Sequence, residues 1–295
     1  MEEMRFTGER GLTITADAAG PESGLPVVLL HGGGQTRGSW KSALRTLASR
    51  GYRVFSLDAR GHGDSDWDPV GDYSLDAQVA DLRCVLNQLP PRPALVGASM
   101  GGVTALMLLG SPATIAIDAR ALVLVDVAPR VDPAGVERIV AFMRANPDGF
   151  KSVEEAANTV TAYNPHRPRP TDVSGLRRNL REKDGRLFWH WDPAFLGDHR
   201  MQPDAYRVRL EEATRRLTVP ALLVRGSRSE LVGDAEVAHF RALMPKAEFV
   251  EVADAGHMVA GDRNDAFNAA IINFLARIDR PCNESMRYSP NRESF

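Results

Sequence analysis

The sequence predicts an α/β fold, in which a mainly parallel sheet carries helices on both faces and a helical segment is inserted before the last two strands. Short apolar runs alternate with longer stretches of helical periodicity along most of the 295 residues. The apolar runs lack the alternation of polar and apolar residues that a half-exposed strand shows, which indicates strands buried on both faces. Residues 127–220 interrupt this rhythm without a clear strand pattern, and a plain crossover is much shorter.

The individual elements follow from these patterns. Strands are expected at residues 26–30, 52–58, 93–98, 121–126, 221–226 and 247–252. Helices are expected at residues 38–49, 74–88, 100–110, 234–244 and 264–278. In the last of these, Phe267, Ile271 and Phe274 recur at helical spacing. Residues 4–17 are expected to add an antiparallel hairpin. The alternation of strand and helix predicts a parallel sheet covered on both sides.

The domain organisation follows from the interrupted rhythm. We assign residues 1–129 and 217–279 to one core domain, and residues 130–216 to a helical cap inserted into it. The cap is expected over the carboxyl ends of the strands, where open α/β sheets bind ligands. The tail, residues 280–295, is polar and aperiodic and is expected to be flexible.

Composition argues against several functional classes. Lysine and arginine number 36 against 38 acidic residues, so nothing favours nucleic acid or an anionic membrane surface as a partner. No apolar run approaches the ~18 residues that span a bilayer, and the charged first ten residues lack the apolar centre of a signal peptide. The two cysteines, Cys84 and Cys282, lie far apart, which argues against a disulfide scaffold or a zinc site and favours a reducing cytoplasm.

The segment LVGASMGG, residues 95–102, places Ser99 between Gly97 and Gly101 directly after an apolar run. A serine on such a tight strand-to-helix turn is typical of a nucleophile elbow, in which small flanking residues let the hydroxyl project above the sheet. The Met100 N–H at the start of the helix would then point toward a developing oxyanion. The alternative is an ordinary buried turn serine, which gives the same letters.

A glycine-rich loop follows the first parallel strand. His31 precedes Gly32, Gly33 and Gly34, and backbone of this kind can approach a ligand closely. We expect the Gly33 N–H to be the second oxyanion donor. The alternative, a phosphate-binding loop, requires a Lys-Ser or Lys-Thr pair that does not follow here.

A serine needs a base to take its proton, and His257 is the candidate. It lies between the last expected strand and the last expected helix, at the same edge of the sheet as Ser99. His31 and His62 also follow strands, but their glycine-rich surroundings favour a role in loop architecture. The chain order of nucleophile, acid and base supports His257.

Four motifs together resemble the α/β-hydrolase fold family. They are HGGG at residues 31–34, DARGHGDS at residues 58–65, GASMGG at residues 97–102 and AGH at residues 255–257. The resemblance covers most of residues 4–279 and implies an eight-stranded, mostly parallel sheet with a cap after the sixth strand. It matches Ser99 to the family's nucleophile, His257 to its base, and Gly33 and Met100 to its oxyanion positions.

The acid of the triad departs from the family pattern. The family usually has an aspartate three residues after the glycine that ends the seventh strand, where this chain has Ser229. Glu230 follows at once and is the favoured acid, because its longer side chain can still reach an imidazole. Asp126, at the end of the sixth strand, is the alternative, at a site that some family members use.

With a serine at position 99, we expect hydrolysis of a carboxylic ester or lactone through an acyl-enzyme. Hydrolysis of a carbon–carbon bond, a cofactor-free perhydrolase reaction and a non-catalytic ligand receptor are the alternatives, because one fold supports many functions. No metal or organic cofactor is expected. The expected partner is a small-molecule substrate, and the sequence does not indicate an oligomeric state.

Aromatic residues of the cap suggest where the substrate lies. Trp189, Trp191, Phe195 and Tyr163 are candidates for an apolar pocket above Ser99. The alternative is that the tryptophans anchor the cap to the core.

Overall fold

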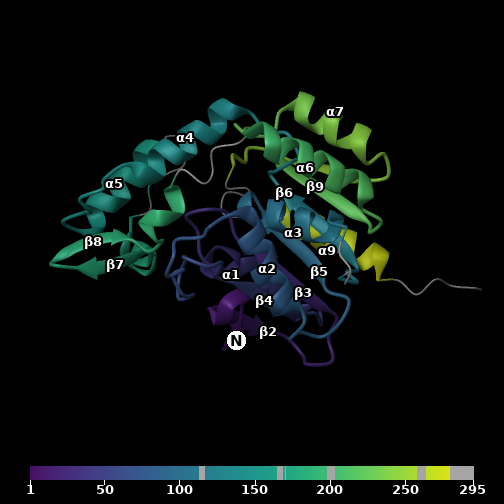
Figure 1. Cartoon of the computed structure of the whole chain (residues 1–295), viewed down its shortest axis with the longest axis horizontal. Coiled ribbons are helices and arrows are strands. Elements are labelled where there is room, and N and C mark those ends of the chain that lie inside the picture. Colours follow the sequence, from purple (N-terminus) through teal and green to yellow (C-terminus); the bar gives the residue numbers. More distant parts are fainter. Residues whose placement is uncertain (113–116, 165–168, 170, 198–202, 258–263, 280–295) are drawn as a thin grey trace, which may run out of the picture.

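The computed structural model describes residues 1–112, 117–164, 169, 171–197, 203–257 and 264–279. Its centre is an eight-stranded sheet in the order β1-β2-β4-β3-β5-β6-β9-β10, with helices on both faces (Figure 1). The strands are β1 Glu2–Thr7, β2 Thr13–Ala19, β3 Pro26–Leu30, β4 Arg53–Leu57, β5 Ala94–Ala98, β6 Ala121–Val125, β9 Ala221–Gly226 and β10 Glu248–Val252. The pairs from β4 to β10 are parallel, and the hairpin β1–β2 joins the edge antiparallel.

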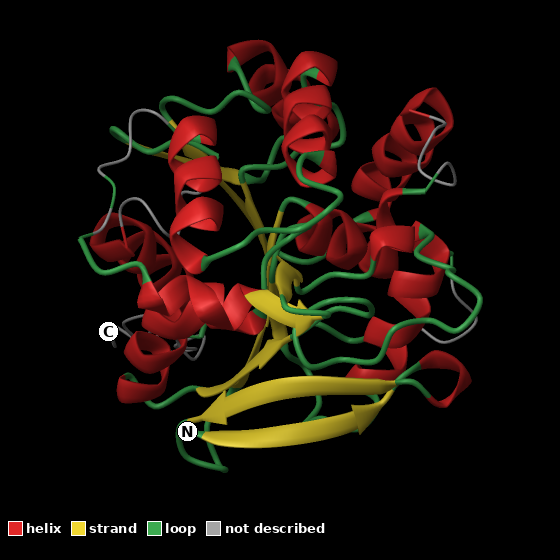
Figure 2. Cartoon of the chain, turned by 90° about the vertical axis from the view of Figure 1, so that its left-hand side faces the viewer, coloured by secondary structure: helices red, strands yellow, loops and turns green. Residues whose placement is uncertain are grey.

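The helices form one layer on each side of the sheet (Figure 2). One layer contains α1 Lys41–Ser49 and α9 Asn264–Ile278, whose apolar residues pack with one face of the central strands. The other contains α2 Leu75–Leu86, α3 Met100–Gly110, α6 Pro203–Arg216 and α7 Asp234–Leu243. The central strands are buried throughout, as their apolar runs predict. The expected α/β architecture is therefore confirmed.

The chain between β6 and β9 also contains two helices and a hairpin away from the central sheet. They are α4 Pro133–Arg144, α5 Val153–Tyr163 and the two-stranded sheet of β7 Leu180–Lys183 and β8 Arg186–Trp189. In Figure 1 this group lies to one side of the core. It differs from the purely helical segment that we expected.

The reason for the hairpin is its turn. Asp184 and Gly185 have φ angles of 51° and 73°, the pair of positive values that a two-residue hairpin turn requires. The Asp-Gly pair is thus a strand-pairing signal that helical periodicity around it obscures.

Helix α6 belongs with the layer on the sheet, although the expected cap range includes it. It packs along α3 so closely that a Cβ on Gly110 would lie 2.2 Å from the Ala213 carbonyl oxygen. We therefore use "cap" below for residues 130–197 only. The division of the chain into a core and a cap stays a prediction.

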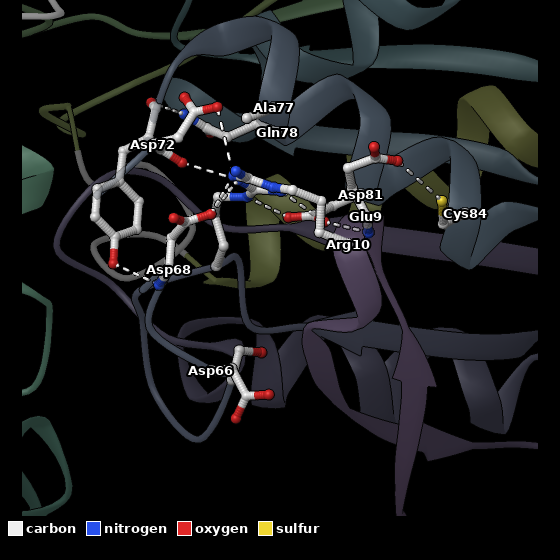
Figure 3. Close-up of polar contacts among 12 residues, drawn as sticks. Glu9, Arg10, Asp66, Asp68, Asp72, Ala77, Gln78, Asp81 and Cys84 are labelled. Carbon is white, nitrogen blue, oxygen red and sulfur yellow. Dashed lines mark hydrogen bonds and ion pairs between the residues drawn. The ribbon is translucent and has the colours of Figure 1, made fainter. Parts of the chain in front are cut away.

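A buried arginine holds the long loop after β4. The Arg60 guanidinium contacts the carboxylates of Asp81 at 2.5 Å and Asp68 at 3.1 Å. Asp68 also pairs with Arg10, so the loop is tied both to α2 and to the turn after β1 (Figure 3). Arg60 is 1% exposed, and a buried charge of this kind requires such compensation. The loop is therefore a firm support for the side chains that it carries.

Two further expectations can be compared with the structure. The described helices include none with the length and apolar character needed to cross a bilayer. The expected flexible tail, residues 280–295, lies outside the described residues.

Candidate active site

Ser99 lies on a sharp turn between β5 and α3. Its φ of 45° and ψ of −115° are values that a non-glycine residue rarely adopts. The turn is crowded, since a Cβ on Gly97 would lie 2.5 Å from the Gly101 backbone, and one on Gly101 would lie 2.5 Å from the Leu30 carbonyl oxygen. Glycine at both positions is thus required by close packing. The strained turn is the geometry that an exposed nucleophile needs.

Asp126 occupies the neighbouring strand end. The pairing of Ala98 with Val125 places Ser99 and Asp126 side by side at the carboxyl edge of the sheet. Asp126 has a φ of 50° and is fully buried. One carboxylate oxygen, Oδ2, lies 2.7 Å from Nδ1 of His257, and the other accepts from the Gly226 N–H at 3.3 Å. The carboxylate is thus placed to hold one tautomer of the imidazole.

Ser229 is a contact of the same carboxylate that the sequence did not reveal. Its hydroxyl donates to Asp126 Oδ2 at 2.7 Å and accepts from the N–H groups of Leu231 and Val232 at 3.1 and 3.0 Å. The signal was present, because Ser229 stands where the family pattern has its aspartate. The hydroxyl supports an acid from the adjacent strand instead.

The expectation that Glu230 contacts His257 is wrong. Its carboxylate lies 3.0 Å from the Arg138 guanidinium, with about half of its side chain exposed (52%). The tight turn that begins at Gly226 directs the Ser229 side chain inward, and Glu230 then faces α4 and solvent. The alternative residue, Asp126, holds the position beside the imidazole.

The glycine-rich loop lies directly against Ser99. A Cβ on Gly32 would lie 3.3 Å from Ser99 Cβ, and one on Gly33 would lie 4.0 Å from Met100 Sδ. Among the described residues, the Gly33 N–H has no protein acceptor. The Met100 N–H begins α3, where a first-turn amide receives no acceptor from its own helix. The two amides that we expected as oxyanion donors thus lie on adjoining segments.

Cap aromatics pack on this loop. Phe195 is 1% exposed, and its ring would lie 3.3 Å from a Cβ on Gly33. Trp191 is 5% exposed, and its ring would lie 3.4 Å from a Cβ on Gly34. Trp189 and Tyr163 are only partly buried, and both contact Phe142, with their ring centroids 5.9 and 4.3 Å from the Phe142 centroid. Burial raises the pKa of the Tyr163 hydroxyl, and the charge of Glu230 adds to this effect. The four aromatics therefore divide into two that support the loop and two that lie farther along the cap.

The described parts of the chain contain no group of three His, Cys, Asp or Glu side chains arranged to bind a metal ion. This arrangement can support attack by the Ser99 hydroxyl, with the His257 imidazole as proton acceptor and the Asp126 carboxylate orienting that imidazole.

This chain is similar to several known proteins. A family model described as the alpha/beta hydrolase family matches residues 27–270. The chain is 30% identical to an sn-1-specific diacylglycerol lipase of Mus musculus, over 90% of this chain and 86% of the lipase. It is 31% identical to an esterase of Mycobacterium tuberculosis, over 80% of this chain and 78% of the esterase.

Solved structures give the same fold. A crystal structure of E-2-(acetamidomethylene)succinate hydrolase superposes with a TM-score of 0.80 at 24% identity, covering 93% of this chain and 99% of the hydrolase. A structure of the esterase from M. tuberculosis superposes with a TM-score of 0.69 at 29% identity, covering 93% and 92%.

Proposed function

Because this chain belongs to the alpha/beta hydrolase family, we propose that it is a serine hydrolase that cleaves carboxylic esters or lactones through an acyl-enzyme. Ser99 is the nucleophile, His257 the general base and Asp126 the acid of the triad. The observation that carries the proposal is the 2.7 Å contact of Asp126 with His257, at the strand end next to the strained Ser99 turn.

The first half of the reaction forms the acyl-enzyme. His257 takes the proton of the Ser99 hydroxyl as the oxygen attacks the ester carbonyl. Asp126 stabilises the imidazolium and keeps Nε2 directed at the substrate. The N–H groups of Gly33 and Met100 stabilise the negative charge on the carbonyl oxygen. His257 then returns its proton to the leaving alcohol.

The second half is the same sequence with water as the nucleophile. His257 removes a proton from water, the hydroxide attacks the acyl carbonyl, and the collapsing intermediate returns the proton to Ser99. The bond and proton changes of both halves require only the three side chains, the two backbone amides and water.

The relatives suggest the class of ester. The names of the lipase and the esterase described above indicate that they act on esters. A 3-hydroxybutyrate-oligomer hydrolase of Cupriavidus necator is also 30% identical to this chain, over 80% of its length. The aromatic surface of Phe142, Tyr163 and Trp189 supports an apolar acyl or alcohol group. We propose a moderately apolar ester as the substrate. The cytoplasmic location that the cysteines indicate stays a prediction.

The test is a panel of p-nitrophenyl esters and lactones of graded size, with labelling by a fluorophosphonate. We expect turnover of at least one ester and a covalent adduct on Ser99 located by mass spectrometry. Ser99→Ala should lose the adduct and lower kcat by on the order of 10³-fold or more while the fold persists. Binding of esters without turnover would favour a receptor, and cleavage of a β-diketone in preference to every ester would favour carbon–carbon bond hydrolysis.

A further inference from the structure

Three buried histidines outside the proposed triad lie in a row beside the glycine-rich loop. His31, His62 and His190 are each 2% exposed or less. The ring centroid of His62 lies 5.1 Å from that of His31 and 5.7 Å from that of His190. His31 follows β3 and His62 belongs to the loop after β4, whereas His190 belongs to the cap and follows β8. The row therefore joins the core to the cap.

The hydrogen bonds of His62 and His190 define the protonation of these two rings. His62 Nε2 accepts from the Gly34 N–H at 3.1 Å, and its Nδ1 faces the Arg60 carbonyl at 3.0 Å. His190 Nδ1 accepts from the Gly63 N–H at 2.9 Å, and its Nε2 faces the Gly34 carbonyl at 3.3 Å. Since an amide can only donate and a carbonyl can only accept, each ring is neutral with a single tautomer.

Gly34 is thus held from both sides by imidazoles. The His62 ring accepts a hydrogen bond from its N–H, and the His190 ring donates a hydrogen bond to its carbonyl oxygen. Gly34 has a φ of 76°, in a turn that the Gln35 N–H closes on the Gly32 carbonyl at 3.1 Å. Gly33 lies inside this turn. The direction of its N–H is therefore set by the tilt of the turn, which the two imidazoles determine.

The two imidazoles have different anchors. His62 stands on the loop that Arg60 fixes to the core through Asp81 and Asp68. His190 stands on the cap, and neighbouring cap groups bind the same core loop: the Arg181 guanidinium donates to the Gly63 carbonyl and the Asp192 N–H to the Gly61 carbonyl. One side of Gly34 is thus held by the core and the other by the docked cap.

We propose that His190 is a positioning residue that couples docking of the cap to the oxyanion site, by fixing the Gly34 peptide and through it the Gly33 N–H. This inference rests on the proposed serine hydrolase function. A cap that is not seated removes the donor to the Gly34 carbonyl, and Gly34 loses one of its two imidazole contacts. Oxyanion stabilisation is then complete only when the cap lies in place over the substrate.

The electrostatic setting supports a permanently neutral ring at this position. Burial lowers the pKa of His190 to about 3, and the nearby His31 acts in the same direction. Arg181 also lowers it, whereas the Gly34 carbonyl and Asp64 act in the opposite direction. The ring therefore keeps its donor and acceptor pattern at neutral pH.

Two substitutions separate the two bonds of His190. The amide of glutamine reaches the place of Nε2, so His190→Gln keeps a donor for the Gly34 carbonyl. The amide of asparagine reaches only the place of Nδ1, so His190→Asn keeps the acceptor for Gly63 and loses the donor to Gly34. We expect His190→Asn to lower kcat by about 10- to 100-fold with KM changed by less than about threefold. His190→Gln should stay within about threefold of the wild type. His239→Asn, which removes a partner of Glu211 on the far helices, is the matched control and should leave kcat unchanged.

A second measurement follows the loop itself. Hydrogen exchange of a peptide covering residues 31–36 should be faster in His190→Asn than in the wild type or His190→Gln. Equal kcat and equal exchange in all three proteins would overturn the proposal. Equal loss of kcat in both variants would also overturn it, because it would indicate packing alone. A wild-type protein that neither turns over an ester nor reacts with a fluorophosphonate would refute the serine hydrolase proposal, and the exchange comparison would still decide whether His190 holds the loop.

Discussion

Asp126 lies 2.7 Å from His257 and belongs to the strand next to the one that ends in Ser99. Asp126→Asn removes the negative charge that would stabilise the His257 imidazolium, and the amide that replaces it permits the wrong tautomer of the imidazole. We expect kcat to fall by roughly 10³- to 10⁴-fold with little change in KM. Steady-state kinetics on the best ester of the panel, with circular dichroism to confirm folding, measures this.

Glu230→Gln is the matched control, because the exposed pair of Glu230 with Arg138 is worth little. Its kcat should stay within about twofold of the wild type. A crippled Glu230→Gln beside an active Asp126→Asn would return the acid to the loop after β9.

The position of Ser229 offers a way to move the acid. Its hydroxyl already lies 2.7 Å from the Asp126 carboxylate that contacts His257, so a carboxylate at position 229 is within reach of the imidazole. We expect the double variant Asp126→Ser with Ser229→Asp to regain at least about tenfold in kcat over Asp126→Ser alone. Ser229→Asp in the wild-type background serves as control, and it should lower activity because two carboxylates would crowd one site. No gain in the double variant would mean that the turn at Gly226 cannot aim an acid at His257.

The proposed nucleophile and base could be identified from the sequence because each is marked locally. Ser99 is defined by its flanking glycines, and His257 by its place between the last strand and the last helix. The acid could not be predicted in the same way. Asp126 and Glu230 both follow strands, and only the three-dimensional direction of their side chains separates them. The left-handed backbone at Asp126 turns its carboxylate inward, and nothing local in the letters LVLVDVAP reports a φ of 50°.

The contacts of two imidazoles with Gly34 could not be predicted from the sequence, for a different reason. They join His62 and His190, which are 128 residues apart along the chain. The RGHG motif marks His62 as part of loop architecture, but His190 lies among aromatics that suggest only a pocket. A docked cap is needed to bring the two imidazoles to one peptide.

Backbone strain at Ser99 predicts a gain in stability when the nucleophile is lost. Glycine adopts a φ of 45° without the steric cost that serine incurs. Ser99→Gly should therefore raise the free energy of unfolding by about 1 kcal/mol and abolish turnover. Ser99→Ala keeps the Cβ and should abolish turnover without this gain. Urea denaturation of the three proteins compares them, and equal stability of the alanine and glycine variants would show that the turn is unstrained.

The neutral imidazoles predict a loss of stability in mild acid. Burial lowers the pKa of both His31 and His190, the latter to about 3 from an ordinary value of 6.5. The unfolded chain therefore binds protons below pH 6.5 while the folded chain does not, so the stabilising effect of the neutral ring is complete above pH 6.5 and declines as the pH falls toward 3. For His190 this loss is about 1.4 kcal/mol per pH unit within that window. His190→Gln removes this histidine. Between pH 7 and pH 5, the wild type should lose about 2 kcal/mol more unfolding free energy than this variant does. Urea titrations at both pH values supply the comparison, and parallel losses in the two proteins would show that His190 is protonated in the folded state.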